Sequence, residues 1–535
     1  MIDPQGQAIK WIKNKEADNH IVCLKASDST TTIQRSVENC IQFGRPLLIE
    51  NVGESMDPLL EPVLSNQTFK TSTGEIVIKL GDQTISFHEN FKFFMTTILP
   101  NPHYFPEVAV KVALLNFTIT PIGLEEQLLN LTVEEERSDL AELKEKLVLE
   151  NAENKRKIKE IEDKILFLLS NSKGDILDDE VLIETLAESK VTSNEINSAV
   201  EAAEKTESEI DATRELYRPV AFRSSILFFC IADLCIVDPM YQYSLEWFRV
   251  LFRNAFGTAK TSDDLQKRLL FLKDQFLISL YNNVCRSLFE KDKLMFAFNM
   301  CIRIRQGDNA IDSMEWRAFL TGAAKKIDRP RPEGEHSWLT DGTWNNILNM
   351  GDSMPVFGAA FVDDFVANIE HYKAYFDSMA PEKHAHMPGW DDKLNSLQKL
   401  IVLRAIRPDK VVGGMQMYIE EHLDERFLSP PPFDLTPCFE DSLPTTPLIF
   451  VLVTGADPTA ALVKFAEQQG MMGGKYHAIS LGQGQGPKAA VMIETGVKLG
   501  HWCLLQNCHL LVSWMSQLSA IVEARRHSIH YRSTH

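Results

Sequence analysis

Two stretches of the sequence combine residue types and spacing that are typical of phosphate binding. Each has an apolar segment, a short loop, a helical segment and, about 50 positions later, a second apolar segment that ends in two polar residues. The first loop is Asp3–Lys10 and its polar pair is Glu50-Asn51. The second loop is Gly455–Leu462 and its polar pair is Gln506-Asn507. The repeated layout predicts one α/β module that occurs twice in the chain.

Both loops lack side chains that nucleotide binding requires. In the motif G-x-x-x-x-G-K-[ST], glycines let backbone N–H groups surround the phosphates, the lysine reaches the outer phosphates, and the hydroxyl holds Mg²⁺. The first motif position is Asp3 in one loop, which keeps Gly6 further along, and Gly455 in the other. The last three motif positions are Ala8, Ile9 and Lys10 in the first loop, and Ala460, Ala461 and Leu462 in the second.

The metal-binding part of the motif is altered too. An acidic pair at the end of the third strand should bind Mg²⁺ and polarise water, whereas this chain has Glu50-Asn51 and Gln506-Asn507. The same losses in both copies predict no catalytic residue, no bound cofactor and no metal in this chain. The alternative is a free-standing P-loop ATPase with atypical loops, in which Lys10 or Lys464 would replace the missing lysine.

The histidines do not form a convincing metal site. His384 and His386 have no third ligand nearby in the sequence, which is typical of a solvated pair. His103 and Glu107 have helical spacing, but a proline before each of them should prevent a helix.

Two arginines, Arg404 and Arg407, could contact a phosphate. They precede Pro408, however, and capping or ion pairing at a helix end is the expected role there. The sequence shows no convincing Ser/His/Asp or Cys/His arrangement for nucleophilic catalysis.

The segments that must position the first loop alternate between strand and helix patterns. Thr30–Phe43 is expected to be a helix, with Ser29 or Thr30 as N-cap and Gly44 after its end. Pro46–Val52 is continuously apolar, as buried parallel strands are. The other expected elements are strands at His20–Leu24, Phe91–Leu99 and Val112–Thr120, a short helix at Asp57–Leu64, and a hairpin of Glu75–Leu80 with Gln83–Phe87 around Gly81-Asp82. This order predicts a parallel sheet with right-handed crossovers.

A charged helical stretch, Ile119–Tyr217, follows this module. Its seam residues recur at alternating spacings of three and four, which predicts an antiparallel coiled-coil hairpin with its turn at Ser172–Asp175. The seam is expected to contain Leu140, Leu143, Leu147, Asn151, Asn154, Ile158, Ile161, Ile165 and Leu168 on one arm, and Leu182, Leu186, Ser189, Ser193, Ile196, Val200, Ala203, Glu207 and Ile210 on the other. Two arms of about 40 residues could reach roughly 60 Å, at ~1.5 Å per residue.

Composition limits the possible partners. The chain has 535 residues, 44% of them hydrophobic and 24% charged, as in an ordinary globular protein of two to four domains. Its formal charge of −19 argues against nonspecific nucleic-acid binding and against an anionic membrane surface. The longest apolar run, Ile226–Val237, is too short to span a bilayer and contains Asp233. Nine cysteines without a CxxC pair indicate reduced thiols in the cytoplasm.

The sequence therefore predicts an α/β plus α fold, with P-loop-type parallel sheets, a helical lid and a projecting coiled-coil hairpin. The expected domains are an α/β module at 1–120, the hairpin at 121–218, a helical lid at 219–330, a helical connecting region at 331–440 and a shortened second α/β module at 441–535. Because the second copy ends after its third strand, we expect it to be unstable by itself and to promote self-association.

Several longer stretches resemble the C-terminal part of the motor domain of dynein heavy chains, most closely the axonemal branch. The most specific are "MIDPQGQAIKWIKN", "FGRPLLIENVGESMDPLLEPVL", "TTILPNPHYFPEV", "LNFTITPIGLEEQLL", "PLIFVLVTGADP" and "WCLLQNCHL". In that family six AAA+ modules form a ring on one polypeptide. The resemblance covers residues 1 to about 524, as the fifth module, the buttress hairpin and the start of the sixth module.

The resemblance implies a role in ATP-driven, minus-end-directed movement on microtubules in cilia or flagella. ATP and Mg²⁺ would be bound by the first four modules, which this sequence does not include, and not by this segment. The implied partners are the other motor modules, the stalk, intermediate and light chains, and microtubules; the implied location is the cytoplasm and the ciliary axoneme. A second alternative is a coiled-coil adaptor that uses the AAA+ modules as a scaffold.

Overall fold

The computed structural model describes residues 1–530 apart from 27, 55–56, 72–73, 82, 100–101, 172–179, 333, 335, 384–388, 431, 445 and 453–454. The chain divides into two compact units, Met1–Pro430 and Pro431–His535. The expected hairpin turn and the pair His384 and His386 lie outside the described residues.

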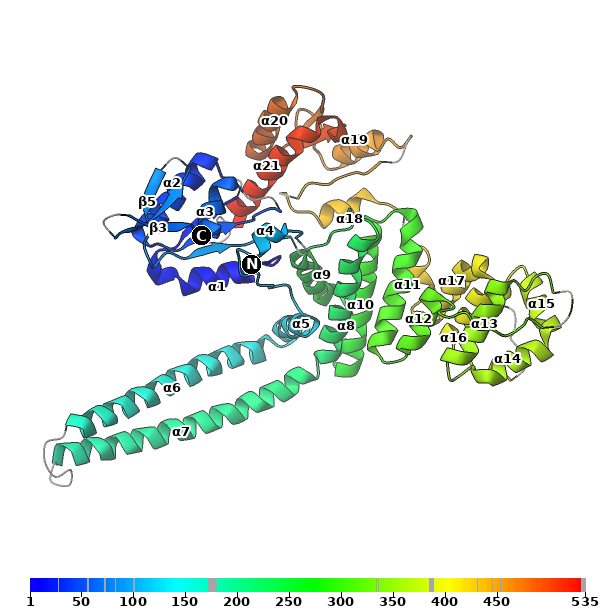
Figure 1. Ribbon diagram of the computed structural model, residues 1–535, viewed down its shortest axis with the longest axis horizontal. Coiled ribbons are helices and arrows are strands. Elements are labelled where there is room, and N and C mark those ends of the chain that lie inside the picture. Colours follow the sequence, from blue (N-terminus) through cyan, green and yellow to red (C-terminus); the bar gives the residue numbers. More distant parts are fainter. Residues whose placement is uncertain are drawn as a thin grey trace. The chain divides into compact units, whose positions relative to one another are not determined.

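The first unit begins with an α/β module that follows the expected order closely (Figure 1). Strands β1, β2 and β6 form a parallel sheet in the order β1-β2-β6, so that Leu47 of β2 lies between Val22 and Phe93. Helix α2 has its predicted bounds, with Ser29 as N-cap and Gly44 in the left-handed conformation at its end. The elements are α1 Gln7–Lys15, β1 Val22–Lys25, α2 Thr30–Phe43, β2 Leu47–Glu50, α3 Glu61–Leu64, β3 Thr68–Lys70, β4 Ile76–Leu80, β5 Gln83–Ser86, β6 Phe93–Met95 and α4 Pro106–Ala109.

The sheet extends beyond β6 through isolated bridges. Ile2 pairs in parallel with Thr97 and with Asn116, which puts the start of the chain between the continuation of β6 and residue 116. The strand predicted at Val112–Thr120 is therefore wrong in extent, because only Asn116 makes a bridge there. Its neighbours are exposed or half-buried, so little apolar burial stabilises a longer pairing.

The predicted hairpin is confirmed as β4 and β5, which pair antiparallel from Val77 with Ser86 to Leu80 with Gln83. Gly81 follows β4 with a φ of 56°, a conformation that glycine adopts without strain. The prediction missed β3, a short strand that pairs antiparallel with β4 and makes a three-stranded sheet.

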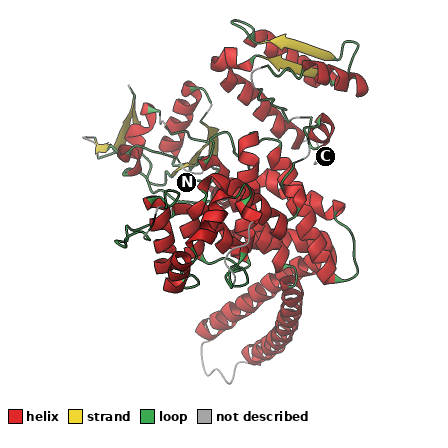
Figure 2. Cartoon of the chain, turned by 90° about the vertical axis from the view of Figure 1, so that its right-hand side faces the viewer, coloured by secondary structure: helices red, strands yellow, loops and turns green. Residues whose placement is uncertain are grey.

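The rest of the first unit is helical, as Figure 2 shows. One hydrophobic core extends from α5 to α17 and includes Phe248, Phe276 and Phe361. The helices are α5 Pro121–Glu136, α6 Ser138–Asn171, α7 Glu180–Glu215, α8 Arg218–Ala232, α9 Leu245–Thr258, α10 Leu265–Cys285, α11 Glu290–Gly307, α12 Ser313–Thr321, α13 Asp341–Ser353, α14 Gly358–Ala367, α15 Ile369–Asp377, α16 Ser396–Ile406 and α17 Val411–His422.

The expected division between 219–330 and 331–440 does not separate two cores. Residues from both stretches, such as Phe298 and Tyr418, belong to the same buried cluster, with ring centroids 5.7 Å apart. Arg329, next to the expected division, is held to this core, because the indole N–H of Trp344 donates to its carbonyl at 2.9 Å.

One helical stretch of the described residues, Arg218–Ile236, is long and apolar enough to cross a membrane, with a mean hydropathy of 1.7. It is longer than the apolar run that the sequence indicated. Half of it is buried, and Leu227 and Ile231 are completely enclosed by the helical core. Its apolar character is therefore accounted for by packing against α5, α10 and α11.

Helices α6 and α7 run in opposite directions side by side and are much longer than the others (Figure 1). Helix α5 is separate from them and buries Leu124 and Leu128 in the helical core, so the long pair begins at Ser138 rather than at residue 121. Leu143 was wrongly expected in the seam: it is 40% exposed, and Lys144 occupies the half-buried position and pairs with Asp211 at 2.5 Å.

The second unit is smaller and less well buried. Strands β7 and β8 pair in parallel from Tyr476 with Trp502 to Ser480 with Gln506, and helices α20 and α21 pack beside each other. Residues 448–452, the apolar segment before the second loop, are unpaired, and Ile449 is 83% exposed. The elements are α18 Leu435–Glu440, α19 Thr459–Gln468, β7 Tyr476–Ser480, α20 Gly486–Leu499, β8 Trp502–Gln506 and α21 Val512–His530.

The second unit should be the least stable part of the chain. Its fully buried apolar cluster is made of Leu481, Ala489 and Trp514 among the described residues, which is little burial for about 100 residues. We expect limited proteolysis to remove Pro431–His535 first and to leave a fragment of the first unit, identified by mass spectrometry. Cooperative melting of residues 431–535 as a protease-resistant monomer would contradict this expectation.

Candidate functional site

The first degenerate loop carries its own anion. Asp3 is completely buried, and its carboxylate accepts hydrogen bonds from the backbone N–H of Gln7 at 2.9 Å and of Ile9 at 3.0 Å. These donors belong to the first turn of α1, the position at which a P-loop helix would meet a phosphate. The positive end of α1 is thus neutralised from within the protein.

The other loop residues contribute no phosphate contact of their own. Gly6 has a φ of 70° and turns the chain into α1, while Ala8, in the first turn of that helix, is completely buried. Ile9, at the position of the phosphate-binding lysine, is half-buried, and Lys10 is exposed. The loop therefore keeps the backbone turn of a P-loop without the cationic side chain.

The polar pair after β2 is committed to structural contacts. Glu50 forms an ion pair with Lys13 of α1 at 2.7 Å, and its side chain is 17% exposed. The hydrogen bond from Lys13 to Glu50 also raises the pKa of Lys13, so this lysine stays protonated. Asn51 follows with a φ of 60°. The carboxylate that would approach Mg²⁺ in an active module instead forms an ion pair with a lysine of α1.

The second loop repeats the arrangement with different residues. Gly455 has a φ of 88°, and Asp457 accepts the backbone N–H of Thr459 at the start of α19, at 2.9 Å. Hydrogen bonds from the side chain of Thr459, and then from its backbone N–H, lower the pKa of Asp457, so its carboxylate is charged at neutral pH. Ala460 and Ala461 are exposed and Leu462 is half-buried, so no side chain there binds a phosphate.

The strand ends of the two copies match in backbone geometry. Asn507 follows β8 with a φ of 55°, as Asn51 follows β2, and both are in the left-handed region that asparagine tolerates. Gln506 ends β8, and the Asn507 amide donates to the Ser480 hydroxyl at 2.9 Å. This shared geometry supports the interpretation of two copies of one module.

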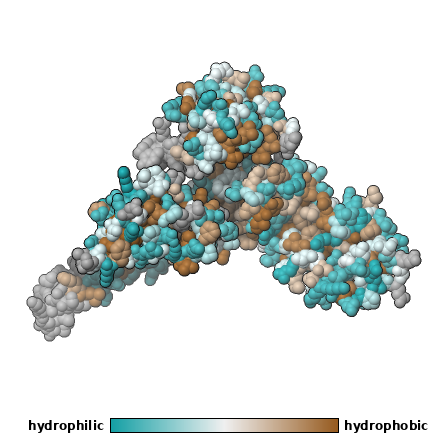
Figure 3. Space-filling view, turned by 45° about the horizontal axis from the view of Figure 1, so that its top comes forward, coloured by the Kyte–Doolittle hydropathy of each residue, from teal (hydrophilic) through white to brown (hydrophobic). Residues whose placement is uncertain are grey.

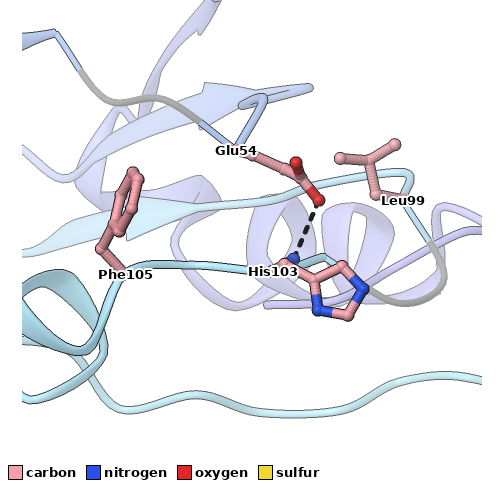
Figure 4. A pocket seen from close by; sticks show the side chains of 4 residues that line it. All are labelled: Glu54, Leu99, His103 and Phe105. Carbon is pink, nitrogen blue, oxygen red and sulfur yellow. Dashed lines mark hydrogen bonds between the residues drawn. The ribbon is translucent and has the colours of Figure 1, made fainter.

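An open pocket of about 620 Å³ lies near the carboxyl ends of β2 and β6, where α/β proteins commonly bind ligands (Figure 4). It is lined by Glu54, Leu99, His103 and Phe105. The Glu54 carboxylate accepts the backbone N–H of His103 at 2.9 Å, and Figure 4 shows the imidazole turned away from that bond.

The remaining candidates from the sequence are structural. Glu107 lies in the short helix α4, which starts at a proline, and His103 lies outside that helix. The described residues contain no group of three or more His, Cys, Asp or Glu side chains that could hold a metal ion. Arg407 pairs with Asp409 at 2.8 Å, as expected, whereas Arg404 donates to carbonyls at the end of α12, including that of Leu320.

The strongest electrostatic cluster lies at the base of the two long helices. Arg218, at the start of α8, pairs with Glu125 at 2.5 Å, with Glu126 at 2.7 Å and with Glu215 of α7. Arg214 of α7 also pairs with Glu126, at 2.5 Å. We call these five residues the root cluster. It joins α5, α7 and α8, so the base of α7 cannot tilt without breaking several charge-assisted bonds.

Within the root cluster, Glu126 stays charged to lower pH than an ordinary glutamate. Hydrogen bonds from Arg218, and then from Arg214, lower the pKa of Glu126 against the opposing effect of burial. The contribution of Glu126 to stability is therefore fully present above about pH 4.3, the ordinary pKa of a glutamate, and is lost as the pH falls through the lowered pKa.

Comparison with known proteins agrees with this architecture. Residues 1–196 match the family model described as the ATP-binding dynein motor region, and residues 443–533 match the dynein heavy chain region D6 P-loop domain. The chain is 48% identical over 525 residues to dynein axonemal heavy chain 1 of Homo sapiens and of Mus musculus. The chain belongs to the dynein heavy chain family.

Other axonemal dyneins are similar over nearly the same length. Dynein axonemal heavy chain 3 of Mus musculus is 46% identical over 523 residues, and dynein axonemal heavy chain 6 of Homo sapiens is 40% identical over 543 residues. These alignments cover 98% of this chain. The chain spans only about an eighth of its dynein relatives, 12% of heavy chain 1 and 13% of heavy chain 3.

Sequence reasoning missed the part that Asp3 plays in this dynein segment. In the sequence, Asp3 takes the place of the first glycine of the motif. In the structure, its carboxylate accepts the N–H groups that would otherwise face a phosphate. The signal in the sequence was an acidic residue at the first motif position, four residues before a helix start. The root cluster was also missed, because its members are about 90 positions apart.

Replacing Asp3 by alanine should destabilise the first module by about 2–4 kcal/mol, because two buried N–H donors lose a charged acceptor. The measurement is the free energy of the urea unfolding transition that belongs to the first unit. Asp28→Ala is the matched control, since the Asp28 carboxylate also accepts one backbone N–H but is exposed. Equal effects of the two substitutions would contradict the structural importance of Asp3.

Proposed function

We propose that this segment is a structural, nucleotide-free part of a dynein motor ring that supports microtubule-based motility in cilia or flagella. The observation that carries the proposal is the Asp3 carboxylate at the start of α1, where a nucleotide phosphate would have to sit. A phosphate there would meet a buried negative charge without a lysine to balance it. The Lys13–Glu50 pair removes the metal-binding carboxylate in the same module.

In this proposal helices α6 and α7 act as a projecting antiparallel coiled coil, the buttress, that supports the microtubule-binding stalk. Their half-buried faces support it, since Leu147, Asn154 and Ile158 on α6 face inward as Ile196, Val200 and Ala203 do on α7. The root cluster would transmit a tilt of the helical core to the base of the buttress. Movement of such rigid elements past one another is a known way of coupling distant sites.

The partners follow from the same proposal. They are the remaining motor modules and the stalk, and through the whole motor the intermediate chains, light chains and microtubules. The expected location is the cytoskeleton of the ciliary axoneme, as the names of the axonemal relatives indicate for those proteins. ATP and Mg²⁺ would act in other modules of the motor.

The rival function is an ATPase with atypical loops, and the family description of residues 1–196 as ATP-binding is its best support. It would require Lys10 or Lys464 to reach the phosphates. Both side chains are exposed, and Lys10 lies one helical position beyond the one that a P-loop lysine occupies. A coiled-coil adaptor remains a second rival, which intact upstream P-loop modules in the same gene would exclude.

We expect no binding of Mg-ATP to either loop in titration calorimetry of the 535-residue chain. The loss of the lysine alone removes about 1.5–3 kcal/mol per charge-assisted bond. Lys10→Gln and Lys464→Gln are the matched variants. Micromolar binding that either substitution abolishes would overturn the proposal and favour the ATPase.

For the buttress, cysteines introduced at Leu147 and Ala203 should form a disulfide within one chain under mild oxidation, because both positions lie on facing seams of antiparallel helices. A cysteine at Leu149, which is 62% exposed, combined with the one at 203 is the control and should not cross-link. Products are separated on non-reducing gels. Cross-links found only between chains would indicate a dimeric coiled coil instead.

A further inference from the structure

A second cavity, of about 340 Å³, lies within the helical core where α11, α16 and α17 meet. Its polar lining includes Arg305 of α11, Ser396 and Lys399 of α16, and Tyr418, Glu421 and His422 of α17. Its volume falls at the lower end of the range of small-molecule sites, roughly 300–1,000 Å³. No residue of the degenerate loops contributes to it.

Arg305 is the unusual member of this lining. Among the described residues no carboxylate lies within ion-pair distance of its guanidinium, and its Nε is buried without a hydrogen-bond partner. Its Nη1 lies 3.3 Å from Nδ1 of His422, a contact that uses a neutral imidazole as acceptor. A permanently charged guanidinium that is left uncompensated in a cavity is costly unless an anion joins it.

Other positive groups surround the same space. Lys399 lines it, and Asp391 is 3.8 Å from this lysine. The first turn of α16 lines it too, and the start of an 11-residue helix favours negative charge. The one carboxylate of the lining, Glu421, is 56% exposed and accepts the Ser396 hydroxyl at 2.6 Å.

The neutral state of His422 fits this arrangement. Burial, followed by the charge of Arg305, lowers the pKa of His422, while Glu421 acts in the opposite direction. At neutral pH the imidazole therefore adds no positive charge. Lys399 is paired with Asp391, and Arg305 is the cation of the lining that has no ion-pair partner among the described residues.

We propose that this cavity binds the phosphate group of a small phosphorylated molecule. The guanidinium offers a planar set of donors that matches phosphate oxygens, and Lys399 and the α16 terminus provide further donors around the same group. The cavity is larger than inorganic phosphate alone needs, which leaves room for the rest of the ligand. Because α11, α16 and α17 share one core, an occupied site would stabilise the helical part of the first unit.

The test is isothermal titration calorimetry of the full 535-residue chain with inorganic phosphate and with pyrophosphate. Each probe should bind with a stoichiometry of one per chain, and pyrophosphate should bind more tightly than inorganic phosphate. Arg305→Gln should weaken binding at least about tenfold, and Lys399→Gln about threefold. Lys410→Gln is the matched control, a half-exposed lysine of the neighbouring turn that does not line the cavity, and should bind like the parent chain.

The proposal is overturned if neither probe binds. It is also overturned if Arg305→Gln leaves the affinity unchanged, because the anion would then bind at another site. Should Arg305→Gln fail to fold by circular dichroism, the comparison of Lys399→Gln with Lys410→Gln decides. Equal affinities of those two variants would overturn the proposal.

Discussion

The ion pairs of the root cluster fix the base of the two longest helices to the rest of the first unit. Arg218 alone contacts carboxylates on α5 and α7, while Leu227, Ile231 and other residues of α8 are buried in the helical core. Two long helices with a polar seam have little stability by themselves. Their direction depends on this base, where Tyr217 is buried, and on the packing of α5 beside α8.

A second constraint acts at the first module, where the protein supplies the charge that a nucleotide would otherwise bring. The backbone of a P-loop offers N–H donors that must be satisfied. Here Asp3 accepts two of them and Lys13 neutralises Glu50, so the module is complete without a ligand. In the nucleotide-free role proposed above, a module built in this way would keep one conformation whatever the nucleotide concentration, which suits a rigid part of a motor. On the face drawn in Figure 3, hydrophilic and hydrophobic residues are interspersed.

The second module shows how far one layout tolerates substitution. Gly455 and Asn507 occupy the positions in the fold of Asp3 and Asn51, and Asp457, two positions after Gly455, accepts one N–H at the start of α19. Its sheet contains β7 and β8, whereas the first module adds β6 and the Ile2 bridges. The exposed Ile449 and Val451 are apolar side chains that pairing in a wider sheet would cover.

Much of this protein could be predicted from local sequence. The bounds of α2, the strands β1 and β2, the β4–β5 hairpin and the altered P-loop positions follow from caps, apolar runs and turn residues within a few positions of each other. Tertiary structure decided what depends on distant partners. Leu143 and Lys144 are adjacent and both fit a helical repeat, and only the Lys144–Asp211 pair determines which one faces α7. Residues 112–120 and 448–452 have strand-like composition, but a strand exists only where a neighbour accepts its hydrogen bonds. The root cluster likewise arises from charges about 90 positions apart that folding brings together, and no local pattern encodes that distance. The hydrogen bonds of Asp3, by contrast, reach only four and six positions along the chain, so its role lay within reach of the local sequence.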